Sequence, residues 1–154
     1  MMTLCCDVLT ALQGKTLVTA ESLTGGGIGA ELTAVSGSSD VYKGGVISYT
    51  DWVKHNVLGV PQSVLETHGA VSESTAAFMA SGVRKLLQAD IAVSVTGLAG
   101  PTGDDYGNPV GTVFIGYEDA EKSVVRHFVF SGDRESVRSQ TIQEALKLIL
   151  DYND

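Results

Sequence analysis

The chain has 154 residues, of which 44% are hydrophobic and 18% charged. This composition predicts one folded domain over residues 1–154 and excludes an intrinsically disordered protein. The formal net charge of −8 argues against nucleic acid and anionic membrane surfaces as partners, because both carry negative charge. No apolar stretch is long enough to span a bilayer and no signal-peptide pattern opens the chain, so we expect a cytoplasmic protein.

The first half of the chain alternates between helical and strand-like patterns. Apolar residues at helical spacing predict a helix over 3–13, which Gly14 ends. The elements predicted next are a buried strand over 17–20, a helix over 25–35, a strand over 46–49, a helix capped by Thr50 or Asp51 and ending at Gly59, a short helix between Pro61 and Gly69, and a long helix from Ser72.

The second half begins with a buried strand over 91–95 and a glycine-rich loop. Strands over 110–117 and 123–130 then have hairpin-like spacing, and a helix over 134–152 follows. The alternation predicts an α/β fold, a three-layer α/β/α domain with a mixed sheet of about five strands. Ligands of such folds gather at the carboxyl ends of strands. Three segments begin there, 21–27, 49–54 and 96–103, and we expect them to converge.

Ser22 lies at the junction between a predicted strand and a predicted helix. Its hydroxyl can cap the helix by accepting a backbone N–H, which is the commoner role at such a junction. It can instead act as a nucleophile, with unpaired N–H groups and the helix dipole stabilising an oxyanion. The glycines at 25, 26 and 27 favour the nucleophile, because they leave space for a substrate beside the chain.

A serine nucleophile needs a base, and the three histidines occupy unpromising positions. A lysine can take this role when burial lowers its pKa. Lys54 lies one helical turn into the segment that follows the predicted strand ending at Tyr49. Tyr49 can hold the lysine in place or serve only in packing, and a lysine on a helix is more often a solvated surface group.

The loop from Gly97 to Gly103 offers backbone N–H groups to a phosphate or an oxyanion, although it can also be a plain connection. Arg134 and Arg138 lie four residues apart, on one face of the last predicted helix. Together they can clamp a phosphate. The alternative is a surface pair that forms salt bridges with Asp133 or Glu135.

Two further types of site fit the sequence less well. The stretch from Gly25 to Ala30 matches the dinucleotide fingerprint G-x-G-x-x-A, which makes an NAD(P)-binding oxidoreductase the runner-up. It fits poorly, because four residues separate the strand from the first glycine. The two cysteines, Cys5 and Cys6, are adjacent and no H-E-x-x-H motif occurs, so we expect no metal site.

Several short motifs occur together in one order and resemble a known family. They are AESLTGG at 20–26, YTDWVK at 49–54, LGV at 58–60, GAVS at 69–72, GLAGPTG at 97–103 and PVGTV at 109–113. In this order they resemble the C-terminal domain of the competence/damage-inducible protein CinA, which also occurs alone as bacterial nicotinamide-nucleotide amidase. The resemblance spans roughly residues 3 to 150.

The resemblance implies an amidohydrolase that converts nicotinamide mononucleotide to nicotinate mononucleotide and ammonia, without a cofactor and commonly as a homodimer. By position, Ser22 attacks the carboxamide, Lys54 takes its proton and Tyr49 lies beside them. The expected substrate-binding residues, including those assigned to the phosphate from the pattern above, are Thr24, Gly25, Gly26, Gly97, Ala99, Gly100, Thr102, Gly103, Arg134 and Arg138.

The sequence departs from the family pattern at two places. Leu23 stands where the family often has Cys, which does not affect a serine nucleophile. Asp104 and Asp105 follow Gly103 where another glycine is common, and they add negative charge near the predicted phosphate site. A third hypothesis is therefore a catalytically silent module that binds a nucleotide without converting it.

Overall fold

The computed structural model describes residues 1–154, which form a five-stranded mixed sheet in the order β2-β1-β3-β4-β5. Strand β1 (Leu17–Glu21) lies between β2 (Tyr42–Ile47) and β3 (Ile91–Gly97) and is parallel to both. Strand β4 (Thr112–Glu118) is antiparallel to β3 and to β5 (Ser123–Val129). The predicted mixed sheet is therefore confirmed.

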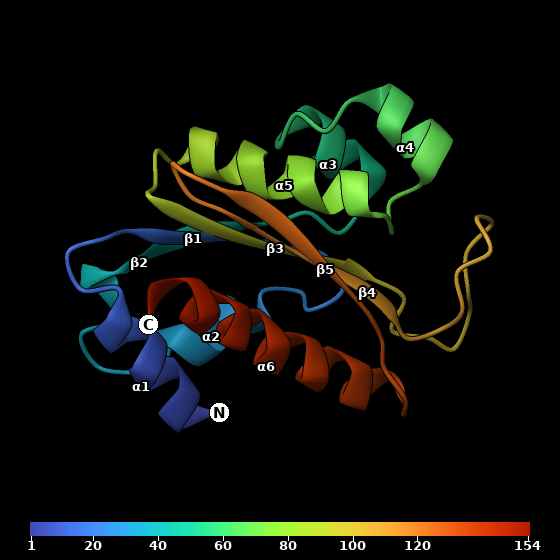
Figure 1. Cartoon of the computed structure of the whole chain (residues 1–154). Helices are drawn as coiled ribbons and strands as arrows, with labels where there is room; N and C mark the ends of the chain where they lie inside the picture. The colour runs from blue at the N-terminus through green and yellow to red at the C-terminus, as the bar shows by residue number, and fades with distance from the viewer.

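Helices cover both faces of the sheet (Figure 1). One face carries α1 (Met2–Ala11), α2 (Gly27–Thr33) and α6 (Arg134–Asn153). The other carries α3 (Asp51–Asn56), α4 (Gln62–His68) and α5 (Glu73–Leu86). The first face has the larger core, with 21 buried residues in one cluster, whereas the cluster under α5 has 9. The three-layer prediction holds.

Two helix starts follow from capping side chains. Thr50 accepts a hydrogen bond from the backbone N–H of Val53 and begins α3, as predicted. Ser72 does the same for α5 by accepting from the N–H of Thr75. A short 3₁₀ helix, Ser38–Asp40, connects α2 to β2.

Strand β2 begins four residues before the predicted strand over 46–49. The first half of β2 was not predicted, because glycines at 44 and 45 have low strand propensity. Gly45 is required there, since a Cβ at that position would lie 2.4 Å from Thr19 Oγ1 on the neighbouring strand. The predicted helix over 25–35 is shorter in the structure, where α2 is confined to Gly27–Thr33.

Gly82 lies where α5 passes over the carbonyl of Leu58, and a Cβ at this position would approach that oxygen closely. Gly82→Ala should therefore lower the free energy of unfolding by about 2 kcal/mol, although alanine is the better helix former. Urea denaturation measures the change. Ser81→Ala, the neighbouring position on α5, is the control and should shift the midpoint little. A stable Gly82→Ala variant would mean that the two segments separate easily.

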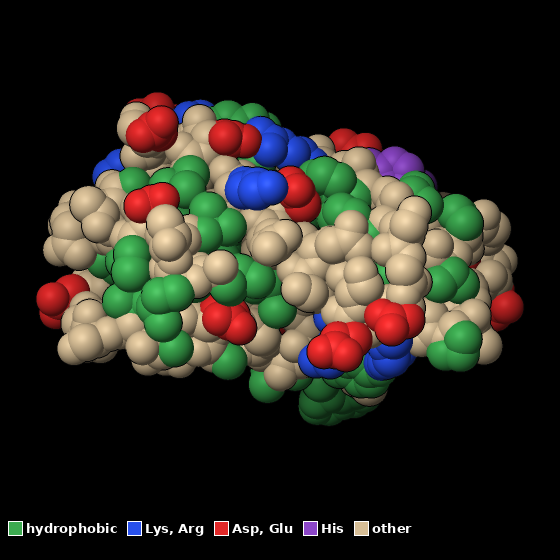
Figure 2. All heavy atoms as spheres, turned by 90° about the horizontal axis from the view of Figure 1, so that it is seen from below, with side chains coloured by type: hydrophobic (Ala, Val, Ile, Leu, Met, Phe, Trp, Pro, Cys, Tyr) green, Lys and Arg blue, Asp and Glu red, His purple; other side chains and the backbone are tan.

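None of the helices combines the length and apolar character needed to cross a bilayer. Figure 2 shows the face covered by α1, α2 and α6, where acidic and basic side chains lie interspersed among hydrophobic ones. Such mixed charge creates no extended positive field of the kind that attracts a phosphate backbone.

Candidate active site

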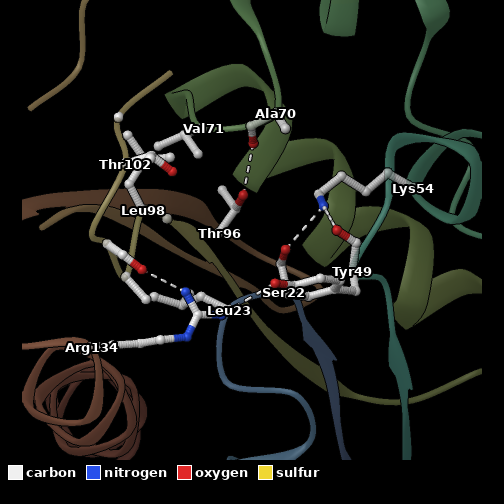
Figure 3. A pocket seen from close by; sticks show the side chains of 14 residues that line it. Ser22, Leu23, Tyr49, Lys54, Ala70, Val71, Thr96, Leu98, Thr102 and Arg134 are labelled. Atoms are coloured by element: carbon white, nitrogen blue, oxygen red, sulfur yellow. Dashed lines mark hydrogen bonds between the residues drawn. The ribbon is translucent and has the colours of Figure 1, made fainter. Parts of the chain in front are cut away.

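A pocket of about 310 Å³ opens at the carboxyl ends of β1 and β3. Three chain segments form most of its wall, and they are the three that the sequence predicted would converge. Figure 3 shows their side chains around the cavity. The lining residues are Ser22, Leu23, Tyr49, Lys54, Ala70, Val71, Thr96, Gly97, Leu98, Ala99, Gly100, Thr102, Gly103 and Arg134. Two of these side chains, Lys54 and Arg134, are basic and none is a carboxylate, in a chain of net charge −8.

Ser22 and Lys54 are in direct contact in this pocket. Lys54 Nζ lies 3.0 Å from Ser22 Oγ (Figure 3). The backbone N–H of Ser22 donates to Val95 O, which attaches the residue to β3. Lys54 is 1% exposed and Ser22 6%, so the alternative of a solvated surface lysine is wrong.

The surroundings of Lys54 Nζ suit a neutral amine. In addition to its contact with Ser22, the nitrogen donates hydrogen bonds to the carbonyl oxygens of Ser48 and Tyr49, at 2.7 and 3.4 Å. Carbonyls only accept, so two N–H bonds of a neutral amine satisfy both. The lone pair then remains for the Ser22 hydroxyl, which can donate its proton to it. No carboxylate contacts the amine.

Burial lowers the pKa of Lys54 from its ordinary 10.5 to about 8, against the opposing effect of the Asp51 carboxylate. Between these two values the unfolded chain keeps a proton that the folded protein has released. Stability should therefore rise with pH across that window and lose this contribution as pH falls toward 8. Urea denaturation of wild type and Lys54→Met at about pH 8 and pH 10 should show wild type gaining roughly 2 to 3 kcal/mol relative to the variant. An equal pH dependence of both proteins would contradict a shifted pKa.

Tyr49 contributes to the dyad differently from the prediction. Its backbone carbonyl contacts Lys54, but its hydroxyl accepts a hydrogen bond from Arg134 Nη2 at 3.2 Å. Arg134 Nη1 also donates to Gly100 O at 2.7 Å. Arg134 therefore joins Tyr49 to the loop on the opposite side of the pocket.

Arg138 does not line the pocket, although it follows Arg134 by one helical turn. Its guanidinium donates to the carbonyl oxygens of Leu23 and Thr24. The predicted clamp of two arginines on one phosphate is therefore divided, with only Arg134 at the cavity. The salt bridges considered as the alternative are absent as well, because neither arginine contacts Asp133 or Glu135.

Three predicted binding residues, Thr24, Gly25 and Gly26, also lie outside the pocket lining. The Thr24 hydroxyl donates to Glu21 instead. A β-turn over Ser22–Gly25, closed by the Gly25 N–H donating to Ser22 O, directs the Thr24 side chain toward Glu21 and leaves Leu23 beside Ser22 in the pocket wall. Ser22 does not cap α2, since that helix begins at Gly27 with Gly26 at its cap position. The capping interpretation of Ser22 is thus wrong.

The Glu21 carboxylate lies at the N-terminal end of α2 and binds its free N–H groups. This role of Glu21 was not predicted from the sequence. This carboxylate is 2% exposed and accepts from the N–H groups of Ile28 and Gly29. The helix dipole is therefore not available to an oxyanion at Ser22. It is equally not available to a dinucleotide pyrophosphate, because a carboxylate already fills the position that the G-x-G-x-x-A fingerprint requires.

The loop between β3 and β4 supplies unpaired backbone donors to the pocket. The N–H groups of Ala99, Gly100, Thr102 and Gly103 have no protein acceptor. Ala99 and Gly100 are nevertheless buried. Unpaired donors at buried positions beside a cavity are suited to an anionic group of a ligand.

The two aspartates that follow this loop are not part of the cavity lining. Asp104 and Asp105 line a neighbouring pocket with Tyr106. Burial is the largest single effect on the pKa of Asp104 and raises it, but the hydrogen bonds from Asn108 and Tyr106 together outweigh burial and hold that pKa below its usual value. The Asp104 carboxylate, one of the two charges expected to weaken phosphate binding, is thus hydrogen-bonded within its own loop.

Five lining residues were not predicted. Leu23, Ala70, Val71 and Leu98 form apolar wall, and the Thr96 hydroxyl donates to Ala70 O. The motif GAVS at 69–72 was noticed only as part of the resemblance. The sequence contained no periodic signal that would place it beside Ser22, since the contact depends on how α5 packs on β3.

Comparisons with known proteins agree with this architecture. A profile of the CinA C-terminal domain matches residues 3–153. A putative competence-damage inducible protein of Thermoanaerobacter pseudethanolicus is 46% identical over 137 residues, which is 89% of this chain and 33% of the relative. A CinA-like protein of Salinibacter ruber is 47% identical over 147 residues, which is 93% of this chain and 35% of that protein. The chain spans about a third of the length of the curated relatives it matches.

Solved structures give the same result. The competence or damage-inducible protein of Enterobacter asburiae superposes with a TM-score of 0.97 at 34% identity, over 99% of this chain and 98% of that chain. The competence/damage inducible protein CihA of Agrobacterium tumefaciens gives 0.95 at 35% identity, over 99% and 95% of the two chains. At these identities the likeness covers sequence as well as backbone.

Proposed function

Because the chain belongs to the CinA C-terminal domain family, we propose that it is a serine/lysine amidohydrolase. Its substrate is nicotinamide mononucleotide, which it converts to nicotinate mononucleotide and ammonia. The observation that carries the proposal is the buried contact of 3.0 Å between Ser22 Oγ and Lys54 Nζ in a pocket that contains no carboxylate.

The reaction uses Lys54 as a proton carrier. Ser22 Oγ attacks the carboxamide carbon while its proton passes to the neutral Nζ, and a tetrahedral oxyanion forms. When the C–N bond breaks, Lys54 returns that proton to the leaving nitrogen and ammonia departs. Water then attacks the ester on Ser22 while Lys54 takes a proton from the water; the C–Oγ bond breaks, Lys54 returns the proton to Ser22 Oγ, and the acid is released.

The pocket suits an anionic substrate of modest size. Its volume of about 310 Å³ is at the lower end of small-molecule sites. Arg134 and the unpaired N–H groups of Thr102 and Gly103 are the groups that would bind the phosphate. The carboxamide would then lie toward Ser22, at the buried end.

The proposal is tested by measuring ammonia release from nicotinamide mononucleotide, with wild type and Ser22→Ala compared under metal-free conditions. Release by wild type alone supports both the reaction and the nucleophile. Release by both proteins would contradict Ser22, and release by neither folded protein would favour the silent binding module. A spectroscopic titration with NAD(P) tests the oxidoreductase alternative. That alternative requires tight binding of the dinucleotide, so the absence of binding would exclude it.

Substrate choice needs its own comparison. Nicotinamide riboside lacks only the phosphate, so Arg134→Gln should raise KM for the nucleotide by about 10-fold or more and leave the riboside reaction nearly unchanged. Equal effects on the two substrates would contradict a phosphate contact at Arg134. Sedimentation at the assay concentration tests the homodimer, which forms part of the same proposal.

A further inference from the structure

The turn over Ser22–Gly25 contains two backbone N–H groups that form no hydrogen bond within the protein. Gly25 N–H donates to Ser22 O at 3.1 Å and closes the turn. The N–H groups of Leu23 and Thr24, in the middle of the turn, have no protein acceptor. Both residues are buried, at 4% and 1% exposure. Buried N–H groups without a partner are rare in proteins, and here they directly follow the candidate nucleophile.

Arg138 holds the opposite side of this turn. Its Nε donates to Leu23 O at 2.9 Å and its Nη2 to Thr24 O at 3.2 Å. In a planar trans peptide the C=O and the following N–H point in opposite directions. Because Arg138 draws the Leu23 carbonyl toward α6, the N–H of Thr24 points away from that helix.

Glu21 fixes the same turn from another side. The Thr24 hydroxyl donates to Glu21 Oε1 at 2.7 Å, so the Thr24 side chain cannot reach its own unpaired N–H or the pocket. Arg138 forms no ion pair with any carboxylate and meets only backbone carbonyls. Its positive charge beside the turn is therefore not cancelled by a contacting anion.

We propose that Arg138 is a positioning residue that holds the Ser22–Gly25 turn so that the N–H groups of Leu23 and Thr24 form the oxyanion hole. This inference rests on the proposed function. As the bond from Ser22 Oγ to the carboxamide carbon forms, the π electron pair moves to the carboxamide oxygen, which accepts from these N–H groups. The pair returns when the C–N bond breaks.

A guanidinium is needed for this task. Its fork places two donors on two successive carbonyls at once, whereas a lysine ammonium is a single point of attachment. The two arginines of α6 thus have different roles, since Arg134 lines the cavity and Arg138 acts on it through the backbone.

Steady-state kinetics of Arg138→Ala and Arg138→Lys provide the first test. Losing an aligned oxyanion donor should lower kcat by about 10²-fold and leave KM nearly unchanged. The pH at which the rate rises should also stay the same, since Lys54 is untouched. Added ethylguanidinium should restore part of the rate to Arg138→Ala, and Arg138→Lys should recover less than half of it. The matched control is Arg126→Ala on β5, which removes an ion pair with Asp151 of α6.

Labelling by a fluorophosphonate separates this inference from the choice of substrate. In that reaction Ser22 Oγ displaces fluoride from phosphorus, its proton passes to Lys54, and the phosphoryl oxygen occupies the oxyanion hole. Intact-mass spectrometry should show wild type labelled at Ser22 and Arg138→Ala labelled about 10²-fold more slowly. If Ser22 is labelled but no ammonia is released from nicotinamide mononucleotide, the proposed substrate is wrong. The role of Arg138 is then still tested by the labelling rates.

Three outcomes would overturn the role of Arg138. The first is equal labelling rates for wild type and both Arg138 variants. The second is a rise in KM with kcat retained, and the third is a loss that ethylguanidinium does not restore in protein whose circular dichroism matches wild type. If Arg138→Ala does not fold, Arg138→Lys decides, because full activity there would show that the paired contact is not needed.

Discussion

Ser22→Ala and Lys54→Met should each reduce kcat/KM for nicotinamide mononucleotide by at least about 10³-fold, and the double variant should lose little more than either alone. The reason is that the two side chains perform one step together. Without Ser22 there is no bond to the carboxamide, and without Lys54 the hydroxyl has no acceptor for its proton. Their 3.0 Å contact is buried, so no solvent base can substitute easily.

The measurement is a double-mutant cycle on ammonia release. Two variants away from the pocket serve as controls, Ser81→Ala on α5 and Lys43→Met on the exposed face of β2. Both should retain wild-type kinetics. Additive losses from Ser22 and Lys54 would mean that the residues act independently, which would contradict the dyad even if each single variant were slow.

Glu21→Ala should have the largest effect on stability, a loss of about 3 to 5 kcal/mol in the free energy of unfolding. The carboxylate accepts four hydrogen bonds, from the hydroxyls of Thr19 and Thr24 and from the N–H groups of Ile28 and Gly29. Removing it leaves the Thr24 hydroxyl and the two N–H groups without a partner, whereas the Thr19 hydroxyl keeps its contact with the Tyr42 hydroxyl. Glu21→Gln should lose less, because its amide oxygen keeps part of the network.

Glu31 provides the matched control for this experiment. It lies on the same helix, α2, and its carboxylate makes no hydrogen bond to the protein. Glu31→Ala should therefore change the urea midpoint only slightly. If Glu21→Ala were equally mild, the hydrogen bonds at the start of α2 would contribute little and the turn after Ser22 would have to be held by other contacts.

The fold was largely predictable because its central strands are mostly apolar. Residues 17–20 and 91–95 are buried on both faces, and a parallel strand covered by helices produces this pattern. Capping residues such as Thr50 placed helix starts correctly for the same kind of local reason. Strand β2 was underestimated, since its glycines are needed for close approach to Thr19 and not for strand formation.

The location of the candidate site could be predicted from the sequence, but many of the side-chain contacts within it could not. Ser22 and Lys54 met because both follow strands whose ends lie side by side. The different partners of Arg134 and Arg138 were not predictable from the sequence. A spacing of four residues predicts that both side chains lie on one face of the helix, but it does not predict which groups they contact. Glu21 was missed because its partners are backbone N–H groups seven and eight residues later, which have no signature in the sequence.

The hydrophobic cores on the two faces of the sheet differ in size. This difference affects the local unfolding of the segments that carry Ser22 and Lys54. Ser22 follows a strand in which every residue is buried, whereas Lys54 is carried by a six-residue helix above the smaller cluster. Local unfolding should therefore begin at α3 and leave β1 closed, with faster amide hydrogen exchange in α3. Each such opening lets water reach the amine and returns its proton affinity toward that of a free lysine. The open form is therefore protonated and unreactive, so the base is active only while α3 is closed over it.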